Sequence, residues 1–186
     1  AWNKLDRVEV PQAVSAQAEE MVHGVLEHWL RHATPVDTAP AVKLVDERGE
    51  HEYELAKIAG SGIHLLPPPG PHLEIEIKIR PPMIYLPNAW WNGRVDAAHE
   101  LFVDPEVIDH KSTGNLKWMK TPEQLRKDVQ SLVYAWSALH ATGKNRVHIR
   151  FIYYKSRKPY KAVPSYVLLE RDEVVANLLP HETMAK

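Results

Sequence analysis

The segment from residue 91 to residue 134 constrains the fold of this chain more than any other feature. GRVD at 93–96 and IDHK at 108–111 each lie in a stretch that is typical of a β-strand, and QSLVY at 130–134 follows in a stretch typical of a helix. Asp96 and Asp109 each lie near the inner end of a predicted strand. Because two carboxylates held close together repel each other, a site that contains both calls for a divalent cation.

Mg²⁺ or Mn²⁺ suits such a pair of carboxylates. A bound divalent cation can hold a phosphate oxygen, lower the pKa of a water molecule and stabilise the charge that develops during phosphodiester cleavage. Lys111 lies two residues after Asp109, so in a strand both side chains point to one face and the ammonium can reach the same phosphate or water. The peptide carbonyl of His110, between them, is a candidate further ligand.

Hydrophobic periodicity and turn residues predict the other elements. A helix is expected over 11–33, with its apolar face formed by Val14, Ala18, Met21, Val25 and Trp29. Further strands are expected over 72–79, 93–102, 106–112, 146–154 and 165–170, with helices over 121–141 and 172–179. Asp104–Pro105 is expected to form a turn, 41–55 a charged hairpin, and the proline-rich 65–71 a stiff connection. This order predicts an α/β fold.

The motifs together resemble the PD-(D/E)XK nuclease superfamily and, within it, the RecB-like branch. That branch carries a helical His, then GxxD, (D/E)xK and QxxxY, which match in order His23, Gly93 to Asp96, Asp109 with Lys111, and Gln130 with Tyr134. The resemblance spans residues 20 to 155. It implies a restriction-endonuclease-like core, in which a central mixed β-sheet is flanked by helices and the two aspartate-bearing strands are neighbours.

The resemblance also implies a role for each matched residue. The implied catalytic residues are Asp96, Asp109, Lys111, Gln130 and Tyr134, and the implied metal ligands are His23, Asp96, Asp109 and the His110 carbonyl. Gln130 and Tyr134 are four residues apart and share a helix face, which would lie over the site. Glu74 or Glu76 is either an extra acidic group of the site or an outward-facing strand charge.

Each matched residue also has a structural alternative. Taken alone, Asp96 is suited to capping a turn after Gly93, and Asp109 with Lys111 to an exposed ion pair on an edge strand. His23 on an amphipathic helix can be a packed histidine, and Tyr134 can be part of the core. His110 can be a surface histidine that contributes only its carbonyl.

Composition is compatible with one intracellular domain. The 186 residues are 44% hydrophobic, without a long apolar run or a signal-peptide pattern, which favours a single domain over 1–186, no membrane association and a cytoplasmic location in a bacterial or phage-infected cell. The absence of cysteine excludes disulfides, thiolate zinc sites and the iron–sulfur cluster of some RecB-like relatives. No GxxxxGK[ST] motif is present, so unwinding would require a helicase or recombination partner.

Residues 143–169 contain no acid and seven Lys or Arg residues, interleaved with Tyr153, Tyr154 and Tyr160. Cations neutralise phosphates and tyrosines stack on unpaired bases, so this stretch is a candidate nucleic-acid surface, with an ordinary solvated basic face as the alternative. Trp118 lies among lysines and could wedge a base at a strand end. The candidate contact residues are Lys117, Trp118, Lys120, Lys155, Arg157 and Lys158.

These features predict a Mg²⁺- or Mn²⁺-dependent deoxyribonuclease, and favour an exonuclease that acts on single strands or duplex ends in DNA repair, recombination or phage DNA metabolism. A structure-specific or restriction-type endonuclease on the same fold is the first alternative. A non-catalytic DNA-binding module is the second. The clustered Asp96, Asp109 and Lys111 argue against it, because a scaffold gains nothing from clustered like charge.

Overall fold

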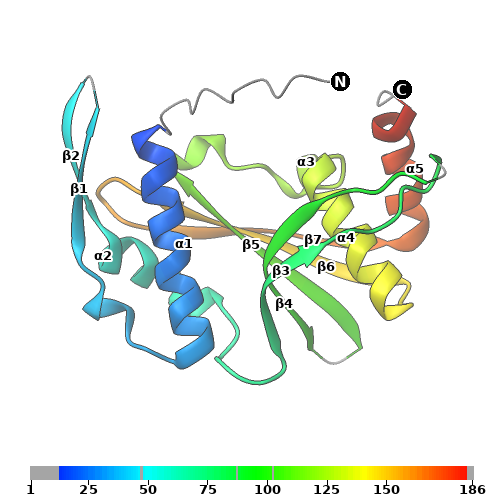
Figure 1. Ribbon diagram of the computed structural model, residues 1–186, viewed down its shortest axis with the longest axis horizontal. Coiled ribbons are helices and arrows are strands. Elements are labelled where there is room, and N and C mark those ends of the chain that lie inside the picture. Colours follow the sequence, from blue (N-terminus) through cyan, green and yellow to red (C-terminus); the bar gives the residue numbers. More distant parts are fainter. Residues whose placement is uncertain (1–12, 47, 87, 102, 184–186) are drawn as a thin grey trace, which may run out of the picture.

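The computed structural model describes residues 13–46, 48–86, 88–101 and 103–183. In this part of the chain, five strands form one sheet in the order β3-β4-β5-β6-β7 (Figure 1). They are β3 (Leu73–Ile79), β4 (Gly93–Leu101), β5 (Asp104–Thr113), β6 (Arg146–Lys155) and β7 (Ala162–Glu170). β5 and β6 run parallel and the other neighbours run antiparallel, so the expected mixed sheet and the adjacency of the two aspartate-bearing strands are confirmed.

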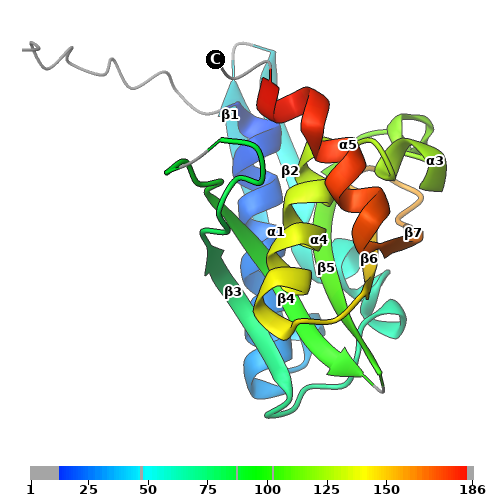
Figure 2. The same ribbon diagram turned by 90° about the vertical axis from the view of Figure 1, so that its right-hand side faces the viewer.

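Helices cover both faces of this sheet, as Figures 1 and 2 show from two directions. On one face lie α1 (Val14–His32) and α2 (Leu55–Gly60), and on the other α4 (Val129–Thr142) and α5 (Arg171–Thr183). A short α3 (Pro122–Leu125) precedes α4, and 3-10 turns occur at Val36–Thr38, Ile63–Leu65 and Leu116–Trp118. The expected hairpin is present as β1 (Ala41–Asp46) and β2 (Gly49–Glu54), with residue 47 of its turn outside the described residues.

Strand β6 joins the two cores, because successive residues of a strand point to opposite faces. Phe151 and Tyr153 pack with α4 and α5, and Ile152 and Tyr154 pack with α1 and α2. A strand buried on both faces accepts apolar and aromatic residues without alternation, which accounts for FIYY at 151–154. The sheet thus separates two apolar layers, and the aspartate-bearing β5, the middle strand of the sheet, lies next to β6.

After Ala18, the buried face of α1 is shifted by one position along the chain from the predicted face. The side chains that face the core are Val14, Ala18, Val22, Leu26 and Leu30, while Met21 of the predicted face is 37% exposed. Both sets recur at spacings of three or four residues, so the helical period alone could not select between them. Packing against α2 and the sheet selects the set that contains Val22 and Leu26. The predicted start of this helix at residue 11 lies outside the described residues.

Two further predictions about elements were wrong, and one helix was not predicted. Asp104 and Pro105 belong to β5 and do not form a turn, because they pair with Leu101 and Glu100 of β4. The helix expected over 121–141 is two helices: Thr121 caps α3 through a capping box with Gln124, and Asp128 then caps α4 by accepting a hydrogen bond from Ser131 N (3.1 Å). Helix α2 was not predicted, because six residues are too few for a clear period.

The end of α4 agrees with its sequence signal. Gly143 follows the helix with φ of 70° and donates its N–H to Leu139 O, which is the left-handed cap that glycine favours.

Within the described part of the chain, no helix has the length and apolar content that a bilayer crossing requires.

Candidate active site

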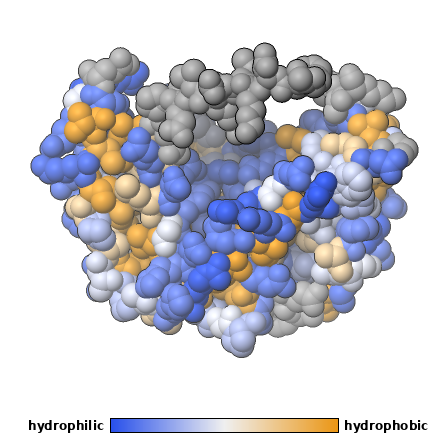
Figure 3. Space-filling model, in the orientation of Figure 1, coloured by the Kyte–Doolittle hydropathy of each residue, from blue (hydrophilic) through white to orange (hydrophobic). Residues whose placement is uncertain are grey.

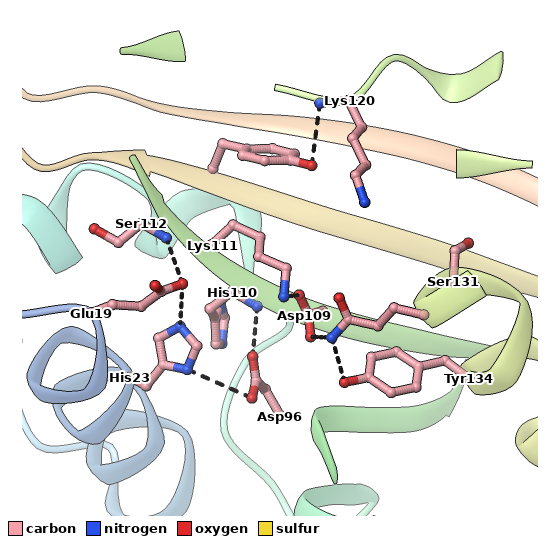
Figure 4. A network of polar contacts seen from close by, with 12 residues as sticks. Glu19, His23, Asp96, Asp109, His110, Lys111, Ser112, Lys120, Ser131 and Tyr134 are labelled. Atoms are coloured by element: carbon pink, nitrogen blue, oxygen red, sulfur yellow. Dashed lines mark hydrogen bonds and ion pairs between the residues drawn. The ribbon is translucent and has the colours of Figure 1, made fainter. Parts of the chain in front are cut away.

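The site forms at a fork between β4 and β5. The pairing between these strands ends at Ala97 and Ile108, and the next residue on each strand beyond that pair is an aspartate. Beyond the fork, the His110 N–H requires an acceptor other than a β4 carbonyl. The carboxylate of Asp96 accepts this N–H at 2.6 Å, so Asp96 lies between the strands where pairing stops (Figure 4).

The Asp96 side chain lies on the face of the sheet that α1 covers, beside His23. Its Oδ1 lies 3.7 Å from His23 Nδ1, and its side chain is 13% exposed. Burial raises the pKa of Asp96 to about 6, although the His110 N–H and the Lys111 charge act to lower it. The turn-capping alternative is therefore wrong, since Asp96 lies inside β4 and caps no turn. A cation beside this carboxylate would stabilise its charged form.

The Asp109 side chain lies on the opposite face, which α4 covers, and Asp109 is 2% exposed. Its Oδ2 lies 2.7 Å from Lys111 Nζ, and its Oδ1 accepts a hydrogen bond from Gln130 Nε2 at 3.3 Å. Burial raises the pKa of Asp109 to about 6, with Lys111 acting in the opposite direction. Burial acts to lower the pKa of Lys111, but Asp109 raises it above its ordinary value and keeps the ammonium charged. The exposed edge-strand alternative is wrong, because β5 is the central strand of the sheet and the Asp109 side of this pair is buried.

Gln130 and Tyr134 extend from one face of α4 over the fork, as their spacing predicted. Gln130 Nε2 donates to Tyr134 OH at 2.8 Å, and Tyr134 OH donates to Arg94 O at 2.5 Å. Burial raises the pKa of Tyr134 above its ordinary value, so the phenol keeps its proton. Tyr134 therefore connects the start of β4 to the amide that orients Asp109. Its ring is also part of the core, as the structural alternative proposed, and its catalytic role stays a prediction.

His23 and Glu19 reach the fork from α1. His23 lies between Asp96 and Glu19, with 3.9 Å from its Nε2 to Glu19 Oε1. Glu19 also accepts a hydrogen bond from Ser112 N at 3.1 Å, which attaches α1 to β5. Sequence analysis missed Glu19. The available signal was its position four residues before His23, which places both side chains on one face of the helix.

His110 is a buried residue, contrary to the surface alternative. It is 2% exposed, with its ring 5.7 Å from that of His23 and its Nδ1 3.4 Å from Tyr154 OH. Burial lowers the pKa of His110 to about 3, so the ring is neutral. Its backbone N–H, which contacts Asp96, is the group that the structure brings to the site. The role expected for its carbonyl stays a prediction.

A groove of about 610 Å³ leads to Asp96 between α1 and β3–β4. Its acidic lining residues are Glu19, Glu20, Glu27, Glu76 and Asp96. Figure 3 shows a hollow on this side of the molecule with hydrophilic residues visible in it. Of the two extra acids considered, Glu76 lines this groove and pairs with Arg94 at 2.9 Å, whereas Glu74 lines a different cavity beneath α4.

The donor set fits a divalent cation in its chemistry. Two buried carboxylates have raised pKa values, and His23 Nε2 is buried without a hydrogen-bond partner. Within the described residues, no three His, Cys, Asp or Glu side chains converge into a complete ligand cluster. Mg²⁺ and Mn²⁺ are often held by one or two carboxylates and complete their shells with water and substrate phosphate. The fork fits that mode.

The candidate nucleic-acid residues differ in their surroundings. Trp118 is 72% exposed, and Lys117 Nζ lies 4.8 Å from its ring centroid. Lys120 pairs with Asp128, and Lys158 pairs with Glu54 at 2.9 Å. The proposed stacking role of Tyr153 and Tyr154 is wrong, because both are buried in the core, with 6% and 0% exposure.

Comparison with known proteins adds little. No family model and no curated protein matches the chain. A solved structure described as the crystal structure of SSO0001 is similar to it at 15% sequence identity and a TM-score of 0.36, over 61% of this chain and 51% of that chain. This chain thus spans half the length of that structure. A similarity of this size carries no conclusion about family or activity.

Proposed function

We propose that this chain is a RecB-like nuclease of the PD-(D/E)XK superfamily, which hydrolyses DNA phosphodiester bonds with Mg²⁺ or Mn²⁺. The observation that carries the proposal is the fork, where the buried carboxylate of Asp109 and the largely buried carboxylate of Asp96, both with raised pKa values, lie beside the partly exposed, charged Lys111. Desolvating these charges destabilises a protein, so a cluster of such charges favours a functional role over a structural one. A DNA substrate agrees with the intracellular location expected from the sequence.

The proposed roles follow from the contacts. Asp96 and Asp109 would hold the cation, with His23 at its Asp96 side. When bound, the cation would supply charge for the scissile phosphate and a more acidic water. Lys111 Nζ, kept protonated by Asp109, would donate a hydrogen bond to the phosphate or to the attacking water. Gln130 would hold the Asp109 carboxylate in place through its amide, and Tyr134 would hold Gln130.

We propose an exonuclease, and the choice between exonuclease and endonuclease has a direct test. End-labelled linear DNA and covalently closed circular DNA would be incubated with the protein, with and without Mn²⁺. Shortening of the linear substrate alone supports the exonuclease. Nicked circles would support the endonuclease instead. No cleavage of either substrate would contradict both.

The first prediction concerns Lys111 and separates an enzyme from a binding module. Lys111→Ala should remove most cleavage, because a lost transition-state contact typically costs about 3 kcal/mol or more. DNA affinity should fall by only ~1 kcal/mol, as expected for one cation. Cleavage rate and affinity would be measured on the same preparation with Mn²⁺ present.

The matched control is Lys43→Ala. Lys43 also pairs with a carboxylate, Glu50, at 2.8 Å, but on the exposed β1–β2 hairpin. This variant should keep wild-type cleavage. Wild-type rates in Lys111→Ala would contradict the assigned role, and a wild-type protein that binds DNA without cutting it would favour the binding module.

A further inference from the structure

We infer that Trp118 is a stacking platform for an unpaired base at the end of a DNA substrate. The inference rests on the proposed function and specifies the kind of DNA end that the site accepts. Among large apolar side chains of the described residues, Trp118 has the highest exposed fraction, 72%. An indole exposed in this way offers a ring face on which any base can stack, whatever the sequence.

The Trp118 loop, defined here as residues 114–120, lies beside the fork. It begins directly after β5, the strand that carries Asp109 and Lys111. It returns over β6, where Lys120 N donates to Tyr153 OH at 3.2 Å. Tyr153 is the register partner of Lys111 in the β5–β6 pair, and paired strands lie about 4.8 Å apart. The end of the loop at Lys120 therefore lies against the neighbour of Lys111, and Trp118 precedes that contact by two residues.

The Trp118 loop is held by its own contacts. The Asn115 side chain accepts a hydrogen bond from Lys117 N at 3.0 Å, and Thr113 Oγ1 donates to Asn115 O at 3.0 Å. Leu116 and Met119, on either side, pack against the α4–α5 core. The exposed indole thus projects from an anchored turn. A preorganised platform loses little conformational entropy when a base stacks on it.

One cation lies over the indole, and a second lies beside the start of its loop. Lys117 Nζ lies 4.8 Å from the ring centroid, and a Cβ placed on Gly114 would lie 3.8 Å from Arg157 Nε. Because Lys117 and Arg157 are exposed, both can neutralise phosphates that flank a stacked base. An aromatic face with adjacent cations matches the chemistry of a single-stranded nucleotide. The terminal bases of a blunt duplex remain paired and stacked on each other, so an unpaired tail is the better ligand.

The experiment compares two DNA hairpins, one blunt and one with a short single-stranded tail ending in 2-aminopurine. Binding would be measured with Ca²⁺ in place of Mn²⁺, and 2-aminopurine fluorescence would report stacking. Wild type should bind the tailed hairpin more tightly and quench its fluorescence. Trp118→Ala should lose about tenfold affinity for the tailed hairpin and keep its affinity for the blunt one. Trp118→Phe should retain most of the preference, because it keeps a ring.

The matched control is Trp90→Ala. Trp90 is also exposed, at 44%, and also has a cation over its ring, Arg80 at 5.1 Å, but it lies before β4 and outside the Trp118 loop. Its loss should leave the preference for the tail unchanged. The inference is overturned if Trp118→Ala keeps the wild-type preference, if Trp90→Ala loses it equally, or if wild type shows no preference.

The two proposals fail in different ways. A protein that prefers the tail through Trp118 but cuts no DNA with Mn²⁺ would contradict the nuclease and leave the stacking platform standing. A protein that cuts DNA but ignores the tail would contradict the platform alone.

Discussion

The Asp96 side chain illustrates how the site departs from what stability alone would select. Its carboxylate lies among Glu19, Glu76 and Asp109, whose negative charges all disfavour ionisation. His23 provides little compensation, because burial lowers the pKa of its ring and favours the neutral form. An ionised Asp96 is therefore a destabilising feature of the metal-free protein. A bound cation would reverse that effect.

The second prediction uses the sign of this pKa shift. The folded protein holds the Asp96 proton more tightly than the unfolded chain, since the pKa rises from 3.8 to about 6. The contribution of Asp96 to metal-free stability is therefore greatest below about pH 4 and decreases as the pH rises to about 6. Asp96→Asn should stabilise the metal-free protein at pH 8 by on the order of 2 kcal/mol. Urea denaturation at pH 5 and pH 8 would measure this change.

Mn²⁺ should act in the opposite direction. It should raise the melting temperature of wild type at pH 8 and have little effect on Asp96→Asn, which lacks the charge to hold it. Asp46→Asn is the control, because Asp46 lies on the surface and its hydrogen bonds with His51 and Arg48 lower its pKa. A less stable Asp96→Asn at pH 8 would show that Asp96 contributes to folding rather than to metal binding.

At the scale of elements, α5 secures the connection between β3 and β4 that runs past the site. Glu182 is fully buried, and its carboxylate accepts hydrogen bonds from Ile84 N (3.0 Å), Tyr85 N (2.7 Å) and Trp91 Nε1 (3.0 Å). Trp91 lines a cavity together with Gln130 and Tyr134. The end of α5 thus fixes a segment that would otherwise leave buried N–H groups without acceptors.

The third prediction tests this link. Glu182→Ala should destabilise the fold by roughly 3 to 5 kcal/mol, because it leaves three donors without their acceptor. Glu182→Gln should cost less, since its amide oxygen still accepts hydrogen bonds. Urea titration would measure the free energy of unfolding of both variants and of a control, Glu173→Ala. Glu173 also lies on α5, and this control removes its partly exposed ion pair with Arg126. That control should cost at most about 1 kcal/mol. Equal losses in Glu182→Ala and Glu173→Ala would contradict the link.

At the scale of the whole molecule, acids from other elements offset part of the basic stretch over 143–169. Arg146 pairs with Asp104 at 2.8 Å, and Arg150 pairs with the buried Glu106 at 2.5 Å. Lys158 pairs with Glu54 from the hairpin at 2.9 Å. An acid-free segment in sequence is therefore not an equally basic surface in the fold. Arg157, which lies beside the Trp118 loop, is better placed to contact a phosphate than Lys158.

The fourth prediction follows from this difference. Arg157→Ala should weaken DNA binding across sequences and reduce the slope of log affinity against log salt by about 1. Lys158→Ala should change the slope less, because Glu54 already offsets its charge. Binding would be measured over a salt series, with Lys43→Ala as the variant expected to change nothing. An unchanged slope in Arg157→Ala would contradict this prediction and would support the alternative that residues 143–169 form an ordinary solvated basic face.

The sequence alone determined the positions of most elements and the residues at the centre of the site. Period-two alternation located β3, and Gly143 marked the end of α4. Asp96, Asp109 and Lys111 are candidate site residues on the sequence alone, because their residue types and spacing indicate a metal and phosphate site without knowledge of the fold. The element predictions are confirmed where strand periods, helix periods and caps depend on residues near one another in the chain. The catalytic roles of Asp96, Asp109 and Lys111 stay predictions.

Only the tertiary structure decided which distant residues meet. The fork exists because β4–β5 pairing stops at Ala97 and Ile108, and no local pattern states where pairing stops. The contact of Glu19 with Ser112, the burial of Tyr153 and the pairing of Lys158 with Glu54 depend in the same way on packing between separate elements. Residues far apart in the chain are brought together by burial and strand register, which are properties of the whole fold.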